Sequence, residues 1–358
     1  LIFLPLFSTR NDSLLYARGF GWADKEKGIK MEPNMLMRFA SVSKLITAVG
    51  IMKLQEMKKL KLNEKVFGPK GILNDTTYNN GIKDQRYYDI TVEQLLRHQA
   101  GFNNYAGDPV SSTRYIMMQN RLTSPPDHKT LLKILLKRHL GYTPGQGKCY
   151  SNLGYMILSM VIEKKSGMKY ENFMQKYVLQ PAGCYDMHIA GTYLKDRRPN
   201  ETKYYMHQGS IPVYEYNNSG RLVEKCYGDT DLPRLSGAGA WCGSAAELSR
   251  FIASIDGMPH VKDILSKKSI QFMTTEQPDH QYSIGWNYTP KSNRPWIRTG
   301  SLAGTSALVL KYPDGQCWIL ITNTSTWKGH GFSNDSMAFF EKLRQKYMPS
   351  MPKKDLFI

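Results

Sequence analysis

The stretch FASVSKLITAVG, residues 39–50, places Ser41 and Lys44 three positions apart at the start of an apolar run. A serine hydroxyl is a weak nucleophile that needs a base within hydrogen-bonding reach, and Ser-x-x-Lys on a helix puts both side chains on one face. The spacing recurs at Ser166 and Ser350, but the first match contains a glycine that ends a helix and the second lies in a proline-bearing tail. Ser41 is therefore the candidate nucleophile, at a helix N-terminus where the dipole favours developing negative charge.

A second motif, Tyr150-Ser151-Asn152, stands in TPGQGKCYSNLGY just before an apolar helix. The Tyr-x-Asn spacing also occurs at Tyr78 and Tyr216, so its position carries more information than its spacing. A phenol held in a loop that enters a buried helix can lie near a lysine ammonium, which lowers the pKa of the phenol. Tyr150 is therefore the second candidate.

A third motif, Arg298-Thr299-Gly300, lies in WIRTGSLAGTSA at the end of an expected strand. A small Thr-Gly pair beside a cation lets a substrate lie along the strand edge. A backbone N–H just after the pair can point at an oxyanion. The motif is therefore a candidate substrate-binding edge.

Apolar periodicity and turn residues indicate the elements that must position these motifs. Helical spacing predicts a helix after Ser41, a short one in 90–102 ended by Gly101, and a buried one in 153–167 ended by Gly167. A further helix is expected from about Ser333 to Tyr347. Strand patterns occur near both ends of the chain, at 1–7, 14–24, 282–288, 296–300, 305–312 and 317–323, with Pro313-Asp314-Gly315 as a hairpin turn.

Strands at both ends with helices between them predict the α/β (α+β) class. We expect one sheet assembled from the two termini, flanked by helices, with a mainly helical domain inserted. The sheet domain is placed at 1–70 and 240–358, and the inserted domain at 71–239.

The composition of the 358 residues is that of a globular chain, with 41% hydrophobic residues and no apolar run long enough to span a membrane. The formal net charge of +18 is scattered, and its densest runs, KKLKLNEK and MPKKD, accompany no nucleic-acid-binding signature. We therefore expect no nucleic-acid partner and no transmembrane segment. The five cysteines are far apart and include no Cys-x-x-Cys pair, so we expect free thiols, no metal and no cofactor.

Taken in order, the Ser-x-x-Lys, Tyr-x-Asn and cation-Thr-Gly motifs resemble those of the serine β-lactamase and penicillin-binding superfamily. The resemblance is to its class C branch and runs through most of the chain. It implies an antiparallel sheet flanked by helices, a helical domain, and a site in the cleft between them. The matching stretches are RGFGWAD, FASVSK, ITVEQLLRHQAGF, TPGQGKCYSNLGY, SGMKYENF, SGAGAWCGSAAELSRF, YSIGW and RTGSLAG.

The resemblance also implies roles for individual residues. Ser41 would attack a carbonyl to give an acyl-enzyme, while Lys44 and Tyr150 share the proton transfers. Water or another acceptor would then release the acyl group. Asn152 would hold Lys44 and a substrate amide. The backbone N–H groups of Ser41 and Ser301 would form the oxyanion hole.

By the same resemblance Arg298, Thr299 and Gly300 would face the carboxylate or amide of the substrate. The family usually has Lys or His where this chain has Arg298. An arginine suits a carboxylate but cannot shuttle protons near neutral pH, which argues against β-lactamase activity.

The family also usually carries a helix before the first strand, packed beside the C-terminal helix; without it, we expect 331–347 to expose an apolar stripe.

The leading hypothesis is a serine hydrolase acting on an amide, a D-amino-acid peptide or an ester through Ser41. Its rivals are a true class C β-lactamase and a non-catalytic module that binds cell-wall fragments. The expected partner is a small-molecule or peptide substrate, with peptidoglycan-derived peptides among the candidates, and the expected state is a monomer. The family analogy indicates a periplasmic or extracellular location.

His98 and His330 are interpreted as structural, because no partner acid is identifiable.

Overall fold

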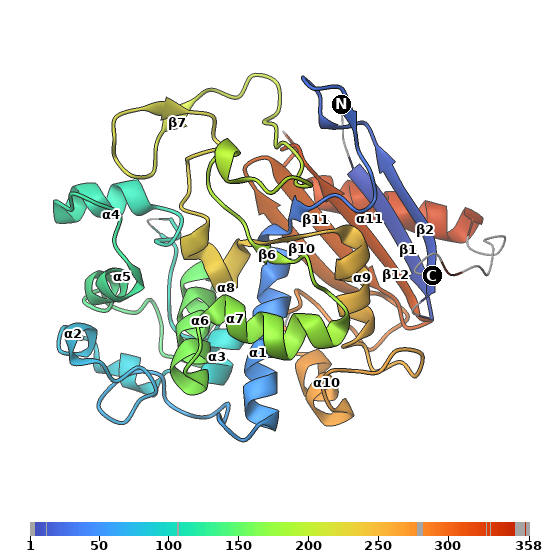
Figure 1. Ribbon diagram of the computed structural model, residues 1–358. Coiled ribbons are helices and arrows are strands. Elements are labelled where there is room, and N and C mark those ends of the chain that lie inside the picture. The colour runs from blue at the N-terminus through green and yellow to red at the C-terminus, as the bar shows by residue number, and fades with distance from the viewer. Residues whose placement is uncertain are drawn as a thin grey trace.

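The computed structural model describes residues 4–11, 13–105, 107–277, 282–326, 328–329, 331–347 and 355. Its largest sheet is antiparallel throughout, and the strand from the N-terminal end pairs with one from the C-terminal end, with Leu6 opposite Leu320. The expected class and the sheet assembled from both termini are therefore confirmed (Figure 1). In spatial order its strands are β10 (Trp296–Leu302), β11 (Thr305–Lys311), β12 (Gln316–Thr322), β1 (Leu4–Arg10) and β2 (Ser13–Phe20).

All side chains of β11 and β12 are buried, and because successive residues of a strand point to opposite sides, both faces of the sheet are covered at these strands. On β12, Ile319 joins the main hydrophobic core on the side of α9 (Ala245–Ala253). The preceding residue, Trp318, packs with Phe340 of α11 (Gly331–Tyr347) on the other side. Figure 1 shows these two helices on opposite faces of the sheet.

Helices are the most frequent regular elements in the segment from 71 to 239, and Figure 1 shows them to one side of the sheet. They are α2 (Thr76–Asn79), α3 (Val92–Leu96), α4 (Thr113–Asn120), α5 (His128–Leu135), α6 (Asn152–Ser166), α7 (Tyr170–Met174) and α8 (Ser236–Gly239). Helices α1 (Ser43–Glu56) and α10 (Lys267–Thr274) lie outside that segment. Within the described ranges, none of the helices combines the length and the apolar character that crossing a bilayer requires.

Short strands complete the fold. A three-stranded sheet has β9 (Trp241–Gly243) between β5 (Met37–Arg38) and β6 (His188–Ile189), and it therefore links the segment 71–239 to the rest of the chain. The proposed division into two domains stays a prediction. Two further pairs are β3 (Trp22–Asp24) with β4 (Ile29–Lys30) and β7 (Val213–Tyr214) with β8 (Leu222–Val223).

Helices α1 and α6 are apolar on nearly all sides, which is the pattern of a buried helix. Every residue of α1 from Ser43 to Met52 is buried, so the helix carries the ammonium group of Lys44 into the core. Helix α6 begins at Asn152 and ends before Gly167, whose φ of +71° fits the left-handed conformation that follows many helices. The expected end of this helix is therefore found.

Three expected elements differ from the structure. The strand expected at 14–24 is divided at Gly21, whose φ is +79°, into β2 and β3, which belong to different sheets. Residues 284–287 form bends instead of a strand, because Gly285 has a φ of +79° and packs its backbone against Leu45 and Ala48 of α1, and within 282–288 only Tyr288 pairs, in a single β-bridge with Ile297. Helix α3 stops at Leu96, before Gly101, because the chain turns sharply where His98 adopts a φ of +58°.

The C-terminal helix does not leave its whole apolar stripe exposed. Phe332, Met337 and Leu343 pack around the cluster that contains Phe340, on the outer face of the sheet. Phe339, by contrast, is 54% exposed. The expectation of an exposed stripe therefore holds for single residues of α11 and not for the face that meets the sheet.

These two neighbouring phenylalanines give a matched pair of stability variants. Phe340→Ala removes a fully buried ring that lies 5.5 Å from Trp318 between ring centroids. We expect it to lower the free energy of unfolding by about 3–5 kcal/mol, as for other buried Phe→Ala changes. Phe339→Ala should change it by less than about 0.5 kcal/mol. Urea unfolding followed by tryptophan fluorescence measures both, and equal effects would contradict the packing of α11 on the sheet.

Candidate active site

Ser41 lies in a tight 3₁₀ turn, Ala40–Val42, that leads directly into α1. The residue before it, Ala40, has a φ of +48°, a conformation that is strained for any residue with a Cβ. Strand β10 lies against this turn, since a Cβ added to Gly300 would be 2.4 Å from the carbonyl oxygen of Phe39 and 2.9 Å from the Ser41 nitrogen. Gly300 therefore lets the backbone of β10 reach the candidate nucleophile.

Lys44 lies one turn into α1 and is fully buried. Its Nζ donates to Ser41 Oγ at 3.2 Å, to Asn152 Oδ1 at 2.6 Å and to the carbonyl oxygen of Ala238 at 2.6 Å. An ammonium has three protons, and these three acceptors match that number, while the hydroxyl of Tyr150 also interacts with the same group. Burial lowers the pKa of Lys44 from its ordinary value, against the opposing attraction of Tyr150.

Tyr150 lies in the loop before α6, with Lys44 Nζ 4.7 Å from the centroid of its ring. Burial by itself raises the pKa of Tyr150. The positive charges of Lys44 and Arg298, together with hydrogen bonds from Lys44 and Ser41, outweigh that effect and lower the pKa to about 8. The phenol is therefore close to its titration point near neutral pH.

Arg298 is buried in the interior of β10, although the sequence placed its motif at the end of a strand. Its Nε donates to the carbonyl oxygen of Ser41 at 2.9 Å, and Nη2 donates to the same oxygen. Nη2 also donates to the hydroxyl of Tyr150 at 3.3 Å. The guanidinium therefore holds the turn of the nucleophile and faces the phenol, while its contact with a substrate carboxylate stays a prediction.

Strand β10 is an edge strand of the sheet, and residues 287 and 288 contact part of its outer edge. The N–H of Thr299 donates to Asn287 Oδ1 at 2.8 Å, and the N–H of Ile297 donates to the carbonyl oxygen of Tyr288 at 2.9 Å, both away from β11. Since N–H directions alternate along a strand, the N–H of Ser301 points to the same outer side. This geometry supports the predicted oxyanion hole.

Asn152 is the first residue of α6, and its side-chain oxygen accepts a hydrogen bond from Lys44 Nζ. The backbone N–H of Asn152 donates to Asp108 Oδ2 at 2.8 Å, so a carboxylate fixes the start of α6. Burial raises the pKa of Asp108, and its hydrogen bonds with backbone N–H groups oppose that effect. Sequence reasoning missed Asp108, because its loop contains no motif that links it to a helix 44 residues later.

His98 contacts the site from the turn after α3. Its ring lies 4.6 Å from that of Tyr150 and 4.8 Å from that of Tyr282 between centroids, and its Nδ1 accepts the N–H of Ser151 at 3.1 Å. Burial lowers the pKa of His98 well below its ordinary value, so the imidazole is neutral. The structural interpretation of His98 fits these contacts, and His330 lies outside the described residues.

The structure thus brings Ser41, Lys44, Tyr150 and Asn152 together from two segments of the chain, with 298–301 as a third segment alongside. A hydroxyl, a buried amine and a phenol of lowered pKa can move a proton, and the backbone edge can stabilise an oxyanion. This set is suited to acyl transfer. Among the described residues, the cluster that could ligate a metal consists of other side chains.

Comparisons with known proteins agree with this geometry. Penicillin-binding protein 4* of Bacillus subtilis is 24% identical over 324 residues, which cover 86% of this chain and 65% of that protein. The teichoic acid D-alanine hydrolase of Staphylococcus aureus is 24% identical over 79% of this chain and 62% of its own length. The chain therefore spans about two thirds or less of these two relatives.

A solved structure, the D-amino acid amidase of Ochrobactrum anthropi SV3, superposes with a TM-score of 0.72 at 18% identity and covers 97% of this chain and 95% of that one. This likeness shows a shared fold. The family model described as Beta-lactamase matches residues 6–338, nearly the whole chain. The chain therefore belongs to the beta-lactamase family.

Proposed function

We propose that this protein is a serine hydrolase that cleaves an amide, a D-amino-acid peptide or an ester through an acyl-enzyme on Ser41. The observation that carries the proposal is the contact of Ser41 Oγ with a buried Lys44, beside a tyrosine whose pKa is lowered to about 8. A hydroxyl with such neighbours is an activated nucleophile.

Before the proposed first step, the positive charges of Lys44 and Arg298 favour the phenolate form of Tyr150, and this phenolate then takes the proton of Ser41 Oγ. The Oγ–carbon bond forms, and the N–H groups of Ser41 and Ser301 stabilise the oxyanion. The bond to the leaving group then breaks, and Tyr150 returns the proton to that group. In the second step, Tyr150 takes a proton from a water molecule, which attacks the ester carbon on Ser41. The bond from that carbon to Ser41 Oγ breaks, and Tyr150 returns the proton to Ser41 Oγ.

The proposed substrate class is an acyl group derived from a D-amino acid. Two relatives support it, since one is a D-amino acid amidase and the other a teichoic acid D-alanine hydrolase. The latter relative and the net charge of +18 also support a periplasmic or extracellular location near an anionic envelope. A monomer and a peptidoglycan-derived substrate remain predictions.

The alternative activity is that of a true class C β-lactamase, which the family match favours. Arg298 counts against it, because the hydrogen bonds described for its guanidinium go to Ser41 and Tyr150. A non-catalytic module that binds cell-wall fragments is the other alternative.

The first prediction concerns the nucleophile. Intact-protein mass spectrometry after incubation with a fluorophosphonate should show one adduct, and Ser41→Ala should abolish it. Ser166→Ala is the matched control, because it also lies in a Ser-x-x-Lys sequence but ends a helix, and it should leave labelling unchanged.

Substrate panels then separate the alternatives. Faster release of p-nitroaniline from D-alanine than from L-alanine p-nitroanilide supports the proposed substrate class, whereas turnover of a cephalosporin supports the β-lactamase. If the folded protein is not labelled by the phosphonate, the binding module becomes the better account.

The second prediction concerns the proton carriers. Lys44→Ala and Tyr150→Phe should each lower the acylation rate by at least about a hundredfold, as expected when general acid-base help is removed. Tyr155→Phe is the control, because this neighbouring buried hydroxyl donates to the carbonyl oxygen of Leu96 instead. Near-normal acylation in both site variants would contradict the assigned roles.

The third prediction concerns pH. Because the phenolate is the reactive form, the acylation rate should rise with pH and level off above the pKa of Tyr150, about 8. Arg298→Gln removes a charge that lowers this pKa, so the rise should move to higher pH, whereas Arg298→Lys should move it less. Stopped-flow acylation across pH measures the shift, and an unchanged profile in Arg298→Gln would exclude the electrostatic role of Arg298.

A further inference from the structure

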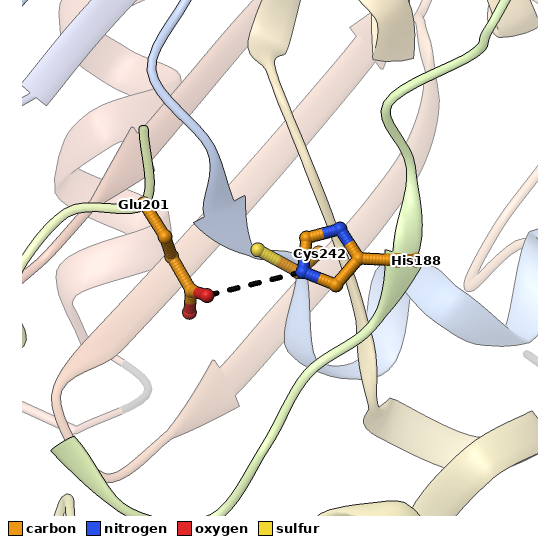
Figure 2. Close-up of side chains that lie close together, drawn as sticks. All are labelled: His188, Glu201 and Cys242. Atoms are coloured by element: carbon orange, nitrogen blue, oxygen red, sulfur yellow. Dashed lines mark ion pairs between the residues drawn. The ribbon is translucent and has the colours of Figure 1, made fainter. Parts of the chain in front are cut away.

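A second group of reactive side chains lies apart from the proposed catalytic residues. His188, Glu201 and Cys242 are all buried, and their ligand atoms lie within 4.8 Å of one another. Figure 2 shows the imidazole and the carboxylate directed toward each other, with the sulfur of Cys242 beside them. None of the motifs in the sequence pointed to this cluster.

The short three-stranded sheet holds these side chains in place. His188 on β6 is directly opposite Cys242 on β9, and Arg38 on β5 is opposite the same cysteine from the other side. Glu201 is held by a β-bridge to Leu36, just before β5. The donors therefore come from backbone segments that pair with one another or lie side by side, which limits their relative motion.

The ring of His188 is oriented as in a metal ligand. Its Nδ1 lies 2.9 Å from the carbonyl oxygen of Asp186, and a carbonyl can only accept, so Nδ1 carries the proton. Metal-ligating histidines commonly donate their second ring N–H to such a carbonyl. The other nitrogen, Nε2, faces Glu201 Oε2 at 3.8 Å, which is too long for a hydrogen bond.

We propose that His188, Glu201 and Cys242 together bind one zinc ion, with a water molecule as its fourth ligand. One nitrogen, one oxygen and one sulfur donor form a set that suits zinc. Ligand bonds of about 2.0–2.3 Å place donor atoms about 3–4 Å apart, so the present cluster needs only small side-chain rotations to close around the ion. Binding would release the thiol proton of Cys242 to solvent, and it should therefore weaken as pH falls.

Two species could lie between His188 Nε2 and Glu201 Oε2: a zinc ion, or a proton bound to Nε2. Tyr204 donates to Glu201 Oε1 at 2.9 Å, and its hydroxyl lies 3.9 Å from Cys242 Sγ. The guanidinium of Arg38 stacks 4.1 Å from the Tyr204 ring and offsets the charge of Glu201 in the absence of metal. A protonated His188 would form a plain ion pair with Glu201, and in that case Cys242 would have no part in it. Cys242 is thus the residue that separates the two accounts.

Cobalt(II) is the probe, because a cobalt–thiolate bond gives a charge-transfer absorption that an ion pair cannot produce. Since the cluster is buried, the protein is both expressed in cobalt-supplemented medium and, in a separate sample, stripped with a chelator and incubated with cobalt. We expect about one equivalent of metal by elemental analysis, the thiolate absorption, and competition by zinc. A rise in melting temperature with zinc is expected as well.

Cys242→Ala should abolish the charge-transfer absorption, and His188→Gln should weaken binding at least about tenfold. Cys184→Ala is the control, because this other buried cysteine lies outside the cluster and should leave the spectrum unchanged. Near-ultraviolet circular dichroism establishes that each variant is folded. Less than about a tenth of an equivalent of metal by both routes, or binding that survives Cys242→Ala, would overturn the proposal and leave the ion pair as the account of the cluster.

Discussion

The arrangement of the site depends on how the ammonium group of Lys44 is buried. A charge taken out of water is costly unless its hydrogen-bonding capacity is filled. Here the three acceptors are Ser41, Asn152 and the carbonyl of Ala238, which belong to the turn before α1, to α6 and to α8. The cost of burial is therefore offset only when these three segments are packed together, so the contact that activates the serine also aligns the helices.

A second constraint is that a phenol lies between two cations of different kinds. Lys44 can lose its proton, and burial already lowers its pKa. An arginine stays charged at any accessible pH. Arg298 therefore supplies a constant positive potential at Tyr150, whatever the protonation state of the lysine. A lysine or histidine at this position would make that potential vary with pH.

Much of the fold could be predicted from the sequence, because strands at both termini and the helix starts have local signals. Ser41 and Tyr150 each stand just before a buried helix, and such positions are visible in a short window. The bend at Gly285 was predicted as a strand, because aromatic residues around it are typical of strands and the sequence does not show that this glycine has a positive φ. Asp108 and Cys242 could not be placed, since their contacts join segments far apart in the chain. The expectation of no metal relied on the absence of Cys-x-x-Cys spacing, but such a spacing reports only donors that are close in the sequence, not donors that strand pairing brings together.

The contact at Gly300 also bears on how activity could change in this fold. Only backbone atoms and a single hydrogen separate β10 from the turn of Ser41, since a Cβ would meet the Phe39 carbonyl oxygen at 2.4 Å. The spacing between nucleophile and oxyanion edge is thus set by main-chain geometry and not by side-chain choice. Substitutions in the surrounding loops can alter which acyl group is admitted without altering that spacing. Selectivity and reactivity are therefore separable properties of this architecture.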